Sequence, residues 1–275
     1  MREVSEGVRV SELAAKAEEL RRRHFADGPL VVLNVWDAAS ARVVADAGHP
    51  VIATSSAAVA SSLGRGDHEH MSADEAFGAI ERIANAVSVP VTADIESGYE
   101  LSPLELAHRL IDAGAVGCNL EDSDHHGGEQ ALVDAERQAQ RIHEVCAAAS
   151  AYGVPVVVNA RVDVYLGAPG SARQRSDEAI RRGRMYLDAG ATCVYPIGLT
   201  DRDEIGLLVR ELAAPVNIWL RKGGPPLAAL QQLGVARISV AAALQNAAMR
   251  AIGDISSAIL DGDDTRLLSG RETRD

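Results

Sequence analysis

The chain has 275 residues and a net charge of −12, with 47% hydrophobic but only 3% aromatic residues. The acidic excess argues against nucleic acid or an anionic membrane as a partner. The charged N-terminus has no apolar signal region, and no apolar run is long enough to span a bilayer, so we expect a cytoplasmic protein.

Apolar runs of strand length alternate with helical patterns along most of the chain. An amphipathic segment from Val8 to Phe25 predicts a lead-in helix. The predicted strands are residues 30–34, 50–54, 89–94, 116–120, 154–160, 192–195, 215–220 and 237–240. The helices predicted after them are residues 38–47, 72–87, 102–113, 134–151, 171–188, 201–212, 225–233 and 242–260.

These eight strand–helix units have strands too apolar to face solvent on either side, which predicts a parallel sheet. Eight units in this length are typical of an α/β fold of the (β/α)8 TIM-barrel type. Glycines 48, 114 and 190 are expected to end helices in the left-handed conformation. An open doubly wound sheet is the alternative, but its Gly-x-Gly-x-x-Gly turn is missing. We expect one domain, residues 1–260, and a polar tail, residues 261–275.

An acidic pair, Asp94 and Glu96, ends the predicted strand at residues 89–94. Side chains alternate between the two faces of a strand, so these carboxylates are expected to point the same way. Two such carboxylates repel each other unless a cation lies between them. Mg²⁺ prefers oxygen ligands, so the pair indicates a metal site, with two solvated acids in a turn as the alternative.

Polar residues gather where the predicted strands end, and a barrel of this type has its active site there. They are Asp37, Ser55, Ser56, Asp94, Glu96, Glu121, Asp122, Asn159, Arg161, Asp163, Arg221 and Lys222. We therefore expect a metal-binding side, formed by the acidic residues, that faces a carboxylate-binding side, formed by the basic residues. Arg161 can hold a carboxylate with two hydrogen bonds. The segment 221–224 either holds a phosphate or caps the following helix.

Five segments resemble the isocitrate lyase/phosphoenolpyruvate mutase superfamily, in the same order and on the expected strands. They are Trp36-Asp37-Ala38-Ala39-Ser40-Ala41-Arg42, Ser55-Ser56-Ala57 with Leu63-Gly64-Arg65-Gly66-Asp67, Asp94-Ile95-Glu96-Ser97-Gly98-Tyr99, Leu120-Glu121-Asp122 and Ala160-Arg161-Val162-Asp163. The resemblance covers the chain from Asn34 to about Ile252.

The resemblance implies a Mg²⁺ ion, or Mn²⁺ in its place, held by Asp94, Glu96 and Glu121 partly through water. It implies a small 2-oxo acid as substrate, such as oxaloacetate, 2-oxoglutarate or a pyruvate-like acid. The substrate-binding residues it implies are Trp36, Asp37, Ser55, Ser56, Ala57, Asn159 and Arg161. It also implies a homodimer or homotetramer that exchanges the last helix between subunits.

The loop after the fourth strand departs from the superfamily pattern. Isocitrate and methylisocitrate lyases carry Lys-Lys-Cys-Gly-His there, whereas residues 123–130 contain neither cysteine nor lysine. The lysine- and asparagine-bearing loop of the mutases is also absent. His125 or His126 can replace the missing acid, because imidazole titrates near neutrality.

These residues favour a Mg²⁺-dependent enzyme that cleaves a C–C or C–P bond of a 2-oxo acid through a metal-stabilised enolate. The catalytic candidates are Asp67, Arg161 and His125. The alternatives are a phosphoenolpyruvate/phosphonopyruvate mutase and a non-catalytic 2-oxo acid binding protein. A Schiff-base aldolase is disfavoured because the only lysines are Lys16 and Lys222. A zinc hydrolase is disfavoured because the strand ends offer carboxylates rather than histidines.

Overall fold

A computed structural model describes residues 2–125, 127–128 and 131–268. Its strands are β1 (Leu30–Val31), β2 (Leu33–Val35), β3 (Ile52–Thr54), β4 (Val91–Asp94), β5 (Gly117–Glu121), β6 (Val157–Val162), β7 (Cys193–Pro196), β8 (Asn217–Trp219) and β9 (Arg237–Ser239). Its helices are α1 (Arg2–Arg23), α2 (Ala38–Asp46), α3 (Ser56–Ser62), α4 (Ala73–Ala84), α5 (Pro103–Asp112), α6 (Ala135–Tyr152), the 3₁₀ helix η1 (Asp163–Leu166), α7 (Ala172–Asp188), α8 (Arg202–Leu212), α9 (Leu227–Gln232), α10 (Ala243–Leu260) and α11 (Thr265–Leu268).

The strands form a closed ring of parallel pairs. Strands β2 to β7 follow one another in sequence order in one sheet, and β1, β9 and β8 form a second. The first predicted strand is divided into β1 and β2, of which β1 pairs with β9 and β2 pairs with β3. A parallel bridge from Val194 in β7 to Val216, just before β8, joins the sheets on the other side. The predicted (β/α)8 barrel is therefore confirmed.

Local sequence signals begin and end the helices as expected. Serines 72, 102 and 171 cap α4, α5 and α7 through reciprocal hydrogen bonds with the residue three positions later. Glycines 48, 114 and 190 have φ values of 93°, 85° and 109°, which confirms the predicted left-handed helix ends. Helix α3 was not predicted, because serine, which favours caps and turns, occupies three of its seven positions.

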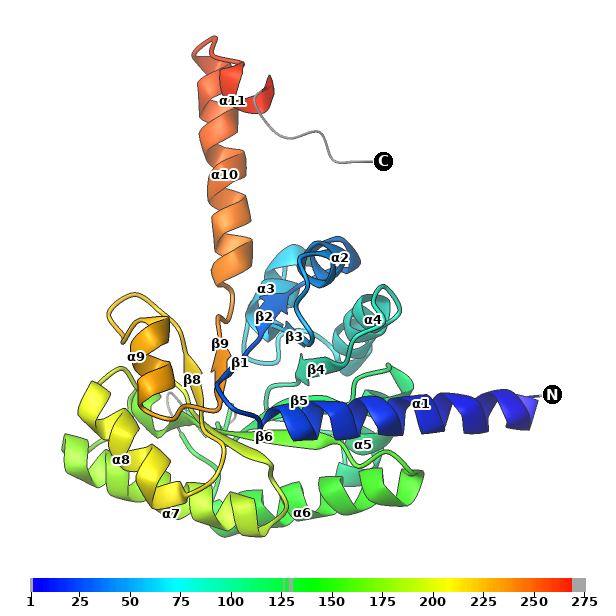
Figure 1. Cartoon of the computed structure of the whole chain (residues 1–275), viewed down its shortest axis with the longest axis vertical. Helices are drawn as coiled ribbons and strands as arrows, with labels where there is room; N and C mark the ends of the chain where they lie inside the picture. The colour runs from blue at the N-terminus through cyan, green and yellow to red at the C-terminus, as the bar shows by residue number, and fades with distance from the viewer. Residues whose placement is uncertain (1, 126, 129–130, 269–275) are drawn as a thin grey trace.

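Helix α10 projects away from the barrel (Figure 1). Of its residues only Gln245 is buried, whereas Met249, Ile252 and Ile259 are 50%, 56% and 44% exposed. An apolar helix face that the described residues leave exposed suits exchange between subunits, which stays a prediction.

The predicted tail spans residues 261–275, and residues 269–275 of it lie outside the described part of the chain. Across residues 2–125, 127–128 and 131–268, none of the helices has the length and apolarity needed to cross a bilayer.

Candidate active site

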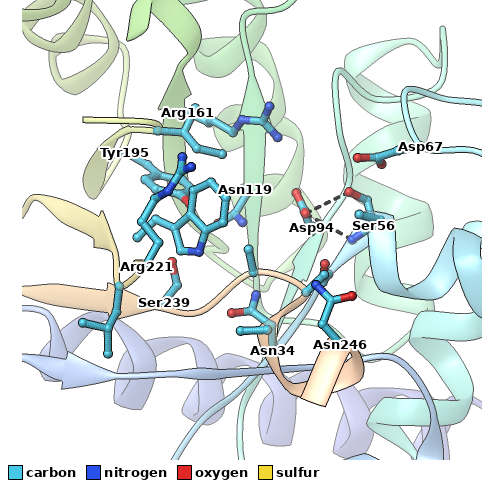
Figure 2. A pocket seen from close by; sticks show the side chains of 18 of the residues that line it. Asn34, Ser56, Asp67, Asp94, Asn119, Arg161, Tyr195, Arg221, Ser239 and Asn246 are labelled. Atoms are coloured by element: carbon cyan, nitrogen blue, oxygen red, sulfur yellow. Dashed lines mark hydrogen bonds between the residues drawn. The ribbon is translucent and has the colours of Figure 1, made fainter. Parts of the chain in front are cut away.

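A cavity of about 560 Å³ lies at the carboxyl ends of the strands. It brings together eight residues that the sequence singled out: Ser55, Ser56, Ala57, Asp67, Asp94, Arg161, Arg221 and Lys222. Ser56, Asp67 and Asp94 lie on one side of this cavity and Tyr195 and Arg221 on the other (Figure 2). The parallel barrel explains this grouping, since it places the ends of all its strands at one rim.

Asp94, the last residue of β4, is held by the start of α3. Its Oδ2 atom accepts hydrogen bonds from the backbone N–H of Ser56 at 3.1 Å and from the hydroxyl of Ser56 at 3.0 Å. Its Oδ1 atom is buried and has no hydrogen-bond partner among the described residues. Burial raises the pKa of Asp94, and the nearby charge of Arg161 opposes this rise. One oxygen of Asp94 is thus fixed and the other is left for a ligand.

Glu96 is 2% exposed and lies just beyond β4. The prediction that Asp94 and Glu96 share one strand face is wrong, because β4 ends at Asp94 and Glu96 has a left-handed φ of 50°. Its Oε1 accepts from the hydroxyl of Tyr99 at 2.9 Å, and its Oε2 accepts from the backbone N–H of Glu69 at 2.5 Å. Burial raises the pKa of Glu96 to about 8, and the acids at 67, 94 and 121 contribute.

Glu121 ends β5, is 2% exposed and has two basic partners. Its Oε2 forms an ion pair with Nη1 of Arg161, and its Oε1 lies 2.8 Å from Nε2 of His125. Arg161 also donates from Nε and Nη2 to the carboxylate of Asp163, at 2.8 and 2.7 Å. Burial raises the pKa of Glu121, while Arg161 and His125 oppose the rise. The hydrogen bond to Glu121 raises the pKa of His125.

A second cavity of about 470 Å³ includes Glu69, Glu121 and His125 among its lining residues. Glu69 belongs to the loop after α3, and its Oε1 accepts from the hydroxyl of Ser97 at 2.7 Å and from the backbone of Tyr99 at 2.6 Å. These bonds attach the loop to the turn after β4. The other candidate acid, His126, lies outside the described residues, as do residues 129–130.

Three predicted substrate-binding residues do not line the main cavity. Asp37 is exposed and caps α2, where it accepts from the backbone and hydroxyl of Ser40, each at 2.7 Å. Trp36 packs against the hydrophobic core. Asn159 is fully buried inside the barrel and donates to Oδ1 of Asn119 at 2.8 Å. Their roles in substrate binding stay predictions.

The cavity also contains residues that the sequence did not single out, namely Asn119, Tyr195, Trp219, Ser239 and Asn246. All except Asn246 belong to strands, namely β5, β7, β8 and β9. A rule that selects every polar or aromatic residue near a strand end would have found these four.

The acidic residues fit a hard cation when water completes the coordination. Within the described ranges, no three His, Cys, Asp or Glu side chains already form a metal-binding group. The unpartnered Oδ1 of Asp94 offers one direct ligand. Both oxygens of Glu96 accept hydrogen bonds from the protein, and Glu121 is hydrogen-bonded to His125 through Oε1 and ion-paired with Arg161 through Oε2, so these two acids suit contact through water. Burial raises the pKa values of all three acids, so a cation bound among them would favour their charged forms.

Comparisons of sequence and fold with known proteins identify the family of this chain. The sequence profile of the phosphoenolpyruvate phosphomutase family matches residues 20–260. An uncharacterized protein of Mycobacterium tuberculosis (strain ATCC 25618 / H37Rv) is 33% identical over 242 residues, which are 87% of this chain and 88% of that protein. An oxaloacetate decarboxylase of Bradyrhizobium sp. (strain ORS 278) is 30% identical over 251 residues, which are 86% of this chain and 82% of the decarboxylase.

Two solved structures extend the comparison. A Burkholderia cenocepacia J2315 protein proposed to be a phosphonomutase has a TM-score of 0.82 and 40% identity, with 88% of this chain and 99% of that chain covered. A 2,3-dimethylmalate lyase has a TM-score of 0.79 and 25% identity, with 90% and 88% covered. The chain therefore belongs to the phosphoenolpyruvate phosphomutase family, within the isocitrate lyase/phosphoenolpyruvate mutase superfamily, and is an enzyme of C–C or C–P bond cleavage.

Proposed function

We propose that this enzyme uses Mg²⁺, or Mn²⁺ in its place, to cleave a C–C bond next to the ketone of a small 2-oxo acid. The single observation that carries the proposal is Asp94, which has one oxygen fixed by Ser56 and the other unpartnered at a cavity that also contains Arg161. An oxaloacetate decarboxylase among the relatives supports an oxaloacetate-like substrate.

In the proposed reaction, the carboxylate of the 2-oxo acid binds at the start of α3 beside Ala57, because the backbone N–H of Ser56 already donates to Asp94. The metal, when bound near Asp94, would supply a Lewis acid that stabilises negative charge on the ketone oxygen. For oxaloacetate, the electron pair of the broken C–C bond moves toward the ketone and gives the enolate of pyruvate and CO₂. The enolate carbon then takes one proton.

His125 is the proposed source of that proton. Its hydrogen bond to Glu121 raises its pKa, which favours the protonated ring near neutral pH. His125 lines the second cavity rather than the main one, so the proton reaches the substrate after movement of the loop or through water. Asp67 lines the main cavity with a buried Oδ1 atom that has no partner among the described residues, and it is the proposed residue beside the bond that breaks.

A phosphoryl mutase is the second candidate, and one observation favours it. The Burkholderia cenocepacia protein proposed to be a phosphonomutase is 40% identical to this chain, more than the decarboxylase at 30%. Phosphonopyruvate therefore belongs in any substrate panel.

The test uses purified protein freed of metal with a chelator and then supplied with Mg²⁺. Product formation from oxaloacetate, 2-oxoglutarate, phosphonopyruvate and methylisocitrate is followed by NMR, with enzyme-free Mg²⁺ samples as the control. We expect Mg²⁺-dependent turnover of at least one compound, and we expect Glu121→Gln to lose both metal and ligand binding. The proposal fails if ligand affinity survives the chelator and the Glu121→Gln change alike.

A further inference from the structure

The segment that follows β8 places a cation against an aromatic ring at the cavity. The guanidinium carbon of Arg221 lies 4.2 Å from the centre of the Trp219 ring, within the range of a cation–π contact. Both residues line the main cavity. Figure 2 shows Arg221 on the wall opposite Ser56 and Asp94. The stacked indole restricts the long arginine side chain, so less conformational entropy is lost when a ligand binds it.

Arg221 and Arg161 differ in whether their charge is already neutralised. Arg161 forms ion pairs with Glu121 and Asp163. Arg221, in contrast, has no carboxylate partner within the described ranges. The Nε1–H group of Trp219 is also buried without an acceptor among the described residues. Arg221 is exposed and its guanidinium can be solvated, so the wall beside β8 offers a ligand a cation without a carboxylate partner and the buried N–H group of Trp219.

Two further observations support a ligand-binding role for this wall. Helix α9 is capped at Pro226 without any side-chain hydrogen bond, so the alternative in which residues 221–224 cap the helix by their side chains is not seen. Lys222 and Arg250 line the same cavity and add positive charge there. The cavity volume of about 560 Å³ falls in the ordinary range for pockets that enclose ligands larger than pyruvate.

We propose that Arg221, positioned by Trp219, receives the second anionic group of the substrate. This inference rests on the proposed function, because it assumes that the 2-oxo acid end lies at Asp94 and Ser56. It narrows the substrate class to 2-oxo acids that carry a distal carboxylate or a phosphonate, and it makes Arg221 a specificity-determining residue. A planar guanidinium suits such a group, since it can donate two parallel hydrogen bonds to it.

The experiment compares matched ligands that differ only in the distal charge. Titration calorimetry in the presence of Mg²⁺ measures the affinity for oxaloacetate against 2-oxobutanoate and for 2-oxoglutarate against 2-oxopentanoate, and kcat/KM takes the place of affinity for any compound that is turned over. The proteins are wild type, Arg221→Gln, Trp219→Phe and the control Arg210→Gln. Trp219→Phe keeps an aromatic ring but removes the N–H group. Arg210 is exposed, belongs to the last turn of α8 and does not line the cavity.

We expect wild type to bind at least one diacid about tenfold or more tightly than its monoacid partner. Arg221→Gln should remove this preference and change monoacid affinity less than about threefold. Trp219→Phe should lose several-fold in diacid affinity alone, and Arg210→Gln should match wild type. Equal affinity for both members of each pair in wild type, or an unchanged preference in Arg221→Gln, overturns the inference and leaves the proposed function standing. Absence of any 2-oxo acid binding in wild type overturns both.

Discussion

Ser56 donates two hydrogen bonds to the same oxygen of Asp94, from its backbone N–H at 3.1 Å and from its hydroxyl at 3.0 Å. The second oxygen of Asp94 keeps no partner among the described residues. The two hydrogen bonds fix the carboxylate of Asp94, so its Oδ1 atom keeps one orientation. Hydrogen bonds from neighbouring residues orient metal ligands in the same way.

Asp94→Asn is expected to abolish the rise in melting temperature that Mg²⁺ causes in wild type, because an amide oxygen carries no charge to attract the ion. Ser56→Ala should weaken Mg²⁺ binding by about tenfold, since the backbone donor remains. Thermal melts at several Mg²⁺ concentrations measure both effects. An undiminished Mg²⁺ response in Asp94→Asn would show that the ion does not bind at this residue.

His125→Gln tests the proposed proton donor. We expect kcat to fall by about 10²–10⁴-fold, because general acid catalysis contributes on that scale, and KM to change only a few-fold. Steady-state kinetics on the substrate found in the panel provide the measurement. His143→Gln, an exposed change in α6, is the matched control. A kcat equal to that of wild type removes His125 from the mechanism.

The burial of His24 is expected to make the free energy of unfolding depend on pH. It is 2% exposed, and its Nδ1 lies 2.8 Å from the carbonyl of Leu20. Burial, with help from the charge of Arg237, lowers the pKa of His24 from 6.5 to about 4. Between these values the unfolded chain binds a proton that the folded chain does not, so the free energy of unfolding falls as pH drops from 6.5 toward 4.

His24 should lower the free energy of unfolding by on the order of 2–3 kcal/mol at the acid end of that pH range, compared with pH 7. Urea denaturation of wild type and His24→Gln at pH 7 and at pH 5 separates this contribution from that of other acids. The difference between the two pH values should be smaller in His24→Gln. Identical pH dependence in the two proteins would mean that His24 titrates normally in the folded chain.

The exposed apolar face of α10 predicts self-association. We expect a homodimer or homotetramer in solution, and Ile252→Glu should shift it to smaller species because a charge would be buried in the contact. Light scattering coupled to size-exclusion chromatography measures the mass. Asp254→Lys, about half a helical turn away, is the control. If the wild-type protein is a monomer, both the predicted self-association and the predicted exchange of α10 between subunits are wrong.

The amino-acid sequence by itself determined the barrel and the set of candidate residues. Short continuous apolar runs and period-3.6 apolar patterns depend on local chemistry, and parallel strands bring their carboxyl ends to one rim. For that reason Ser56, Asp94 and Arg161 were expected in one place, and they line one cavity.

Only the tertiary structure decided which partner each of these side chains meets. The end of β4 at Asp94 and the left-handed backbone at Glu96 replace the expected shared strand face. The pairing of Arg161 with two acids, and the contact of Arg221 with the ring of Trp219, depend on strand register and on loop backbone. Contacts between residues far apart in the chain leave no periodic signal in the sequence, so these features could not be predicted from it.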